Sequence, residues 1–131
     1  MTYPKSMSAN KNHRKALYTK DDIIHQRELF FDKLKQQLRQ SGIDVNEFNM
    51  NKLSDGTLNL KYKSMQIGRV KFSRFGHTIQ VLTPSVQHDI DVDWFKGISF
   101  EKLIVYIPRL VHYAKYLKTF DYMKRKSFIQ S

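Results

Sequence analysis

The stretch that most constrains the fold is residues 57–83, where apolar and polar side chains alternate. In residues 58–63 every second residue is apolar, and this period of two predicts a strand with one buried face and one solvated face. Residues 65–72 keep the alternation but change phase at Gly68, which indicates a β-bulge there. Residues 77–83 supply a third strand, with Ile79 and Val81 facing inward. The sequence therefore predicts three short antiparallel strands.

Basic residues crowd this predicted sheet. No acid lies between Asp55 and Asp89, so nothing on the strands offsets the positive charge. Like charges on neighbouring strands repel, and the arrangement costs stability unless an anionic partner binds there. The predicted binding residues of the sheet are Lys61, Lys63, Arg69, Lys71 and Arg74.

Length and composition bound the class of protein. A chain of 131 residues with 40% hydrophobic content suits one domain with one modest core. The net charge of +11 favours polyanionic partners, DNA or RNA among them. The absence of cysteine excludes a disulfide framework and a thiolate metal site. No apolar run approaches the roughly 18 residues that span a bilayer, so we expect a cytoplasmic protein without a membrane partner.

The N-terminal residues 1–18 contain basic residues, no acid and few apolar side chains. This composition predicts a disordered basic arm that orders on contact with phosphates, or else a solvated terminus without a specific role. The arm residues that we expect to contact nucleic acid are Lys11, Arg14 and Lys15. One domain is predicted over residues 19–123, followed by a basic C-terminal tail over residues 124–131.

The first predicted helix begins after Thr19 and ends at Ser41 and Gly42. A hydroxyl at Thr19 followed by Asp21 and Asp22 is typical of a helix start, and apolar residues then recur at helical spacing. Residues 43–56 are rich in turn formers. We expect their apolar side chains to fold back onto the core; these are Val45, Phe48, Met50 and Leu53.

A second helical pattern follows Gly97 and Ser99 and continues to Leu117. Pro108 lies inside it, so either the helix kinks there or a short first helix ends at Ile107. Tyr106 is expected to pack in the core, whereas the tyrosines that follow it on the helix either pack or stack on bases; these are Tyr113 and Tyr116.

Residues 88–94 alternate aspartates with apolar residues. This spacing is that of the first ligands of an EF-hand calcium loop. Trp94, however, occupies the position of the required glycine, and Phe100 that of the last acidic ligand. The pattern favours an edge strand or extended segment whose acids offset nearby basic charge or repel nucleic acid. The acids are Asp89, Asp91 and Asp93.

The predicted fold class is α+β, in the order α-β-β-β-α, with two helices packed on one face of a small antiparallel sheet. This order resembles that of double-stranded RNA-binding domains over residues 19–120. In that family a lysine-rich start of the second helix contacts phosphates, but here that helix starts at Ser99 with Phe100, Glu101 and Lys102. The family's binding residues are therefore not transferred to this chain.

The chain as a whole also resembles small accessory proteins of phages and plasmids of Gram-positive bacteria. The resemblance lies in a basic arm rich in serine and asparagine, followed by a compact domain without an enzyme motif. Some of those proteins are anti-CRISPR inhibitors or regulators. The resemblance implies either nucleic-acid binding or the inhibition of a nucleic-acid enzyme.

No catalytic motif, cofactor fingerprint or metal-ligand spacing is found in the sequence, so we expect neither an enzyme nor a cofactor. The first hypothesis is an accessory or regulatory protein that binds nucleic acid through phosphate contacts. The second is an inhibitor that binds a nucleic-acid-processing protein complex. The third is a small ribonuclease that uses His77 with Arg69, Lys71 and Arg74.

Overall fold

The computed structural model describes residues 15–84 and 89–130, with side chains described as far as Phe120. Lys11 and Arg14, which we predicted to bind nucleic acid, lie outside the described residues. The elements are α2 (Lys20–Gln40), a single 3-10 turn η1 (Val45–Glu47), β1 (Phe48–Lys52), β2 (Leu58–Tyr62), β3 (Met65–Lys71), β4 (His77–Pro84), β5 (Ile90–Ile98), α3 (Phe100–Val105) and α4 (Ile107–Gln130). The predicted C-terminal tail is therefore mostly the last turns of α4.

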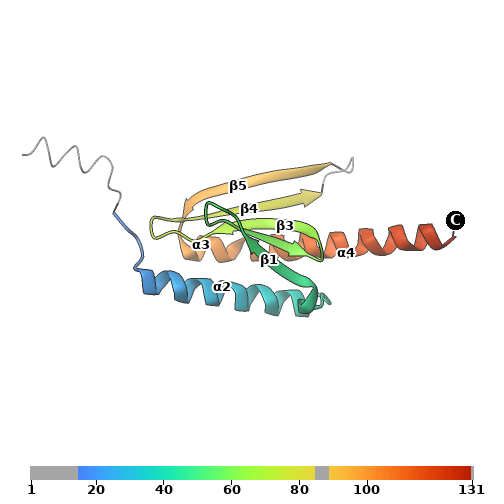
Figure 1. The fold of residues 1–131 in the computed structure, drawn as a ribbon, viewed down its shortest axis with the longest axis horizontal. Coiled ribbons are helices and arrows are strands. Elements are labelled where there is room, and N and C mark those ends of the chain that lie inside the picture. The colour runs from blue at the N-terminus through green and yellow to red at the C-terminus, as the bar shows by residue number, and fades with distance from the viewer. Residues whose placement is uncertain (1–14, 85–88, 131) are drawn as a thin grey trace, which may run out of the picture.

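The fold is α+β, as predicted, with an antiparallel sheet whose strands pair in chain order from β1 to β5. The helices pack on one face of the sheet, where α4 contacts β3, β4 and α2 (Figure 1). The sequence predicted the three central strands. The structure adds β1 within the predicted turn region. The strand β5 is the edge strand that the aspartate-rich segment predicted, and β1 is the other edge of the sheet.

Helix α2 starts and ends where its sequence predicts. The Thr19 hydroxyl accepts a hydrogen bond from the Asp22 amide, and the Asp22 carboxylate accepts one from the Thr19 amide. This reciprocal capping satisfies two of the amides that a helix start leaves free. At the other end, Gly42 takes a positive φ of 79°, the left-handed conformation that commonly terminates helices. The buried face between these ends consists of Phe30, Phe31, Leu34 and Leu38.

The predicted bulge lies beside Gly68. Leu60 pairs with Gly68 and Lys61 with Gln66, which leaves Ile67 as the extra residue of β3. A side chain at Gly68 would clash with α4, because a Cβ there would lie 2.5 Å from Leu110 Cδ2. The glycine therefore allows the helix to approach the sheet backbone closely.

The second helical segment is two helices, as in the second of the two alternatives for Pro108, but the first helix ends at Val105 and not at Ile107. Ser99 caps α3, which ends at Val105, and α4 begins at Ile107 after a break at Tyr106. Pro108 is the second residue of α4, a position where a missing amide hydrogen costs little because no carbonyl precedes it in the helix. Among the described residues, no helix combines the length and hydrophobicity that a bilayer span requires.

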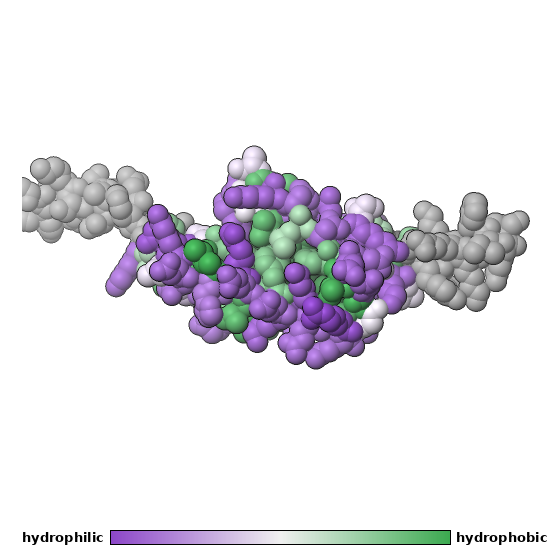
Figure 2. All heavy atoms as spheres, turned by 60° about the horizontal axis from the view of Figure 1, so that its bottom comes forward, coloured by the Kyte–Doolittle hydropathy of each residue, from purple (hydrophilic) through white to green (hydrophobic). Residues whose placement is uncertain are grey.

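The core lies between the helices and the sheet. Phe30 and Leu34 of α2, Leu60 of β2, Ile79 of β4 and Leu110 of α4 are fully buried. Seen with the α2 side forward, hydrophilic side chains surround a smaller apolar area on the surface (Figure 2). Burial of this apolar layer is the main source of folding free energy. On the opposite face of the sheet, no element of the described residues covers the strands.

Candidate nucleic-acid interface

One row of side chains crosses all five strands on the uncovered side of the sheet, which we call the open face. The strand register aligns five consecutive partners, in the order Asn51, Asn59, Arg69, Gln80 and Trp94. Successive residues of a strand point to opposite faces, so the adjacent row must point toward the helices. That row is Met50, Leu60, Gly68, Val81 and Asp93.

The acids of β5 lie on the helix side. Asp93 pairs in the sheet with the buried Val81, and its carboxylate accepts a hydrogen bond of 3.3 Å from the Arg109 guanidinium of α4. Asp91 pairs with Thr83, whose hydroxyl accepts a bond of 2.7 Å from the same guanidinium. The predicted edge strand is therefore present, and its acids point away from the open face. The outward strand positions of the described chain carry no acid.

The open face collects three of the predicted basic residues. Lys61 of β2 and Arg69 and Lys71 of β3 all lie at outward positions, and each side chain is half-buried. Other outward positions carry amide side chains. Gln66 Nε2 of β3 donates a hydrogen bond to Gln80 Oε1 of β4 at 2.6 Å.

The other predicted basic residues lie elsewhere. Lys63 is in the turn between β2 and β3, where its ammonium lies 3.5 Å from a carboxylate oxygen of Glu47. Arg74 is in the turn between β3 and β4, and its Nε donates to the carbonyl of Tyr18 at 3.1 Å. Lys15 is exposed. The sheet face that the sequence predicted is thus formed by three of its five basic residues.

Two polar atoms in the centre of the open face have no hydrogen-bond partner among the described residues. They are Asn59 Oδ1 and Arg69 Nε, and both are inaccessible to solvent. Their residues pair directly across β2 and β3. A buried donor or acceptor without a partner costs about 1–3 kcal/mol, so this face retains hydrogen-bonding capacity that the fold itself does not use.

The edge strand β5 carries exposed apolar side chains. Three alternate side chains of this strand, Ile90, Val92 and Trp94, are each between 44% and 49% exposed. A nine-residue edge strand with an exposed apolar side is uncommon in a protein without a partner, because such edges promote association. Ile90 and Val92 also line a hollow with Tyr113 and Leu117 of α4. Trp94 lies beside Lys96 and adds an aromatic ring to the basic open face.

His77 is part of the core and not of the open face. Its ring is completely buried; Nδ1 accepts from the Ser73 amide at 3.1 Å, and Nε2 lies 2.7 Å from Gln26 Oε1. Burial lowers the pKa of His77, which the nearby Glu101 carboxylate offsets in part. The ring also stacks on Tyr18, and Tyr18 Oη accepts a hydrogen bond from the Phe100 amide. The predicted cluster of His77 with Arg69 and Lys71 is not formed, because those side chains point to the other face.

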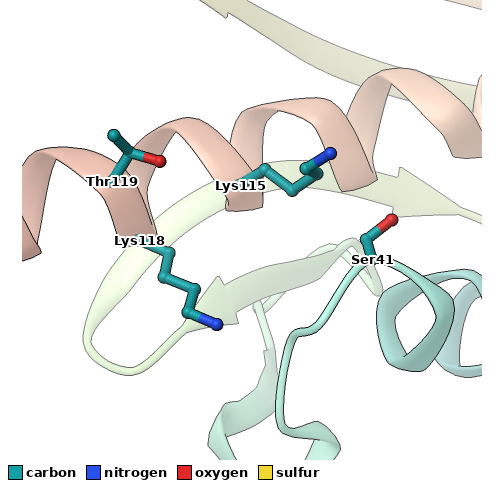
Figure 3. A pocket seen from close by; sticks show the side chains of 4 residues that line it. All are labelled: Ser41, Lys115, Lys118 and Thr119. Carbon is teal, nitrogen blue, oxygen red and sulfur yellow. The ribbon is translucent and has the colours of Figure 1, made fainter.

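Basic residues also line a hollow between the end of α2 and α4. Ser41, Lys115, Lys118 and Thr119 surround it (Figure 3). Lys118 Nζ donates to the carbonyl of Gly42 at 2.6 Å, and a cation at a helix C-terminus stabilises the free carbonyls there. This hydrogen bond gives Lys118 a role in the fold itself. Tyr113 is buried and Tyr116 is half-buried on the same helix, so Tyr113 packs in the core as Tyr106 does against Phe95.

The comparisons with known proteins leave the function open. No protein-family model, curated protein or solved structure matches this chain. In the described part of the chain, no group of three or more histidine and acidic side chains is placed to hold a metal ion. The geometry of the open face is therefore the basis for a functional assignment.

The sequence prediction missed the contribution of β5 to this site. Trp94 and Lys96 both face outward, with Lys96 Nζ 5.9 Å from the centre of the Trp94 ring. The alternation in residues 88–94 already separates the aspartates from the apolar residues onto two faces. It does not say which face is covered, because that depends on the pairing of β5 with β4.

Proposed function

We propose that the protein binds nucleic acid across the open face of its sheet, mainly through phosphate contacts. The observation that carries the proposal is the sorting of charge between the two faces. Lys61, Arg69 and Lys71 point outward together, whereas Asp91 and Asp93 of the edge strand point toward the helices. Positive charge gathered at outward positions attracts a polyanion, although the Asp55 carboxylate before β2 lies near Lys71.

Stability alone does not account for this arrangement. Lys71 and Arg69 are two positions apart on β3 and so lie on the same face, and Lys61 lies on the neighbouring strand. Their mutual repulsion is unfavourable in the isolated domain. Phosphates would neutralise it, and condensed counterions released from the nucleic acid would add to the binding free energy.

The proposal is tested by a salt titration of affinity on random-sequence DNA and RNA. The logarithm of the binding constant should fall linearly with the logarithm of the salt concentration. Replacing Lys61, Arg69 and Lys71 together by Gln should reduce the magnitude of the slope by about 2 to 3 units, because each contact with a phosphate contributes about 0.7 to 0.9.

A matched control removes the same charge from the helices. Lys33 of α2, Lys102 of α3 and Lys115 of α4 are exposed, and replacing these three by Gln should leave the slope within about one unit of the wild-type value. Equal slopes for the two triple variants would show that only net charge matters. Failure of the wild-type protein to bind any polymer at low salt would refute the proposal.

A protein partner is the second candidate, and the apolar stripe of β5 is the observation that favours it. Ile90, Val92 and Trp94 are exposed on an edge strand with unpaired backbone groups, and an extended segment of another protein can pair with such an edge. An inhibitor of a nucleic-acid enzyme would use this stripe. Val92→Lys should then abolish binding to the protein partner while affinity for random-sequence nucleic acid is retained.

A further inference from the structure

A small hollow lies at one end of the open face, beside the turn between β3 and β4. It is lined by side chains from three neighbouring strands, Lys71 of β3, Thr78 of β4 and Lys96 of β5, and by Ser73 of the turn. Two ammonium groups and two hydroxyls can donate hydrogen bonds to an oxyanion, and no acid lines the hollow. This set of donors suits a phosphate group.

The backbone around the hollow is held by two glycines. Gly76 has a φ of 130°, and a Cβ on it would lie 2.8 Å from the Cα of Gly97. The turn therefore packs directly against the backbone of β5, a contact that any larger residue at position 76 would prevent. This contact fixes Lys96 of β5 and Lys71 of β3 around the same hollow.

Aromatic side chains lie beside the hollow. Trp94 is 44% exposed on the open face, and Lys96, which lines the hollow, has its ammonium 5.9 Å from the centre of the Trp94 ring. Phe75, which is 41% exposed, lines the hollow from the turn. A charged site for a phosphate and an exposed ring that can stack on a base are thus adjacent.

A phosphate site beside an exposed aromatic ring suits duplex and single-stranded nucleic acid to different degrees. A duplex offers its phosphates to a flat surface but keeps the faces of its bases stacked inside the helix. A single strand offers phosphates and unstacked bases together, and base–aromatic stacking contributes to affinity without sequence preference. Neither the exposure of Trp94 nor the position of the hollow beside it is needed for phosphate contacts with a duplex.

We propose that this end of the open face binds single-stranded nucleic acid, with a phosphate in the hollow between Lys71 and Lys96 and a neighbouring base stacked on Trp94. The proposal rests on the proposed function and specifies its ligand. The strand would continue over Arg69, where the free Nε of that residue and Asn59 Oδ1 offer a donor and an acceptor for base edges after a small side-chain rotation.

The chain contains a single tryptophan, so its fluorescence reports directly on the proposed contact. The titrants are 15-nucleotide oligo(dT), 15-nucleotide oligo(U) and a 15-base-pair DNA duplex, all at low salt. Both single strands should quench the emission in a saturable manner, because a stacked base quenches the indole. The duplex should bind at least about tenfold more weakly and leave the emission unchanged.

Two variants test the two parts of the site. Trp94→Leu should weaken binding of oligo(dT), followed by fluorescence anisotropy of a labelled strand, by about 5- to 150-fold, the range for loss of one stacked base. Lys71→Gln with Lys96→Gln should lower the magnitude of the salt slope by about 1.4 units, since each single-strand phosphate contact contributes about 0.7.

Matched controls carry the same chemical changes on the helices. Phe120 of α4 is 48% exposed, and Phe120→Leu should leave the affinity for oligo(dT) unchanged. The double variant Lys33→Gln and Lys115→Gln should leave the salt slope within half a unit of wild type.

The outcomes separate this inference from the proposed function. If the wild-type protein binds duplex and single strands equally, without quenching, and Trp94→Leu binds as wild type does, the inference is wrong while nucleic-acid binding stands. If no polymer binds the wild-type protein, the inference and the proposed function are both wrong. If only a protein partner quenches the emission, Trp94 belongs to a protein interface. The quenching measurement uses the wild-type chain and does not depend on the folding of any variant.

Discussion

Two adjacent rows of the sheet differ by one residue on each strand and have opposite composition. The row that faces the helices contains Leu60, Gly68 and Val81, all buried. The neighbouring row contains Asn59, Arg69 and Gln80 and ends at the exposed Trp94. Both rows have the same backbone environment, so the difference lies in what each face contacts. One row packs against the helix layer, and the other is the polar row on which the proposed nucleic-acid interface rests.

The comparison implies that substitutions in the first row and its helical partners affect stability, whereas those in the second affect binding. Leu110→Ala removes a completely buried side chain of α4 and should destabilise the protein by about 2–5 kcal/mol. Lys61→Ala on the open face should change stability by less than about 0.5 kcal/mol. Urea denaturation of both variants measures the two changes in the free energy of unfolding. A similar loss of stability in the two variants would mean that the helix-facing row and the open face contribute equally to stability.

Gly68 tests how closely α4 packs on the helix-facing row. A Cβ at this position would lie 2.5 Å from Leu110 Cδ2 and 2.6 Å from the Gln80 carbonyl oxygen. Gly68→Ala should therefore cost about 1–3 kcal/mol through overpacking. The double variant Gly68→Ala with Leu110→Ala should be destabilised by less than the sum of the two single variants, since the smaller side chain relieves the clash. Strict additivity of the two effects would argue against direct contact.

The pH dependence of stability tests the burial of His77 on the helix-facing side of the sheet. Burial lowers its pKa below the ordinary value of 6.5, so the unfolded chain takes up a proton on acidification before the folded protein does. Stability should be unaffected by this group above pH 6.5 and should decline as the pH falls below it toward the folded-state pKa. In thermal melts between pH 7.5 and 5, His77→Gln should be less stable at pH 7.5 but lose less stability on acidification. An equal loss in both proteins would mean that His77 is not held neutral by the core.

The helix-facing side was largely predictable from the sequence because local rules determine it. Thr19 and Asp22 predict a cap that the structure contains, and the phase change at Gly68 predicts the bulge. The strand β1 was not predicted, because Asn49 and Asn51 favour turns and only the pairing with Lys61 and Asn59 makes this segment extended.

The candidate site was predictable only in part, because a face depends on register. Lys61, Arg69 and Lys71 follow from alternation within their own strands, and the structure keeps them together. Trp94 and Lys96 join them through the pairing of β5 with β4, and alternation within one strand does not determine that pairing. Lys63 and Arg74 are close in sequence to these residues but occupy turns, where alternation no longer determines direction.

Lysine footprinting tests the central claim most directly, because the two sides of the molecule carry comparable lysines. The protein is acetylated with and without saturating 15-nucleotide oligo(dT), and each site is quantified by mass spectrometry. We predict that the bound strand protects Lys61, Lys71 and Lys96 and leaves Lys33, Lys102 and Lys115 as reactive as in the free protein. Protection of the helix lysines with unchanged reactivity on the strands would contradict the assignment of the open face as the nucleic-acid interface.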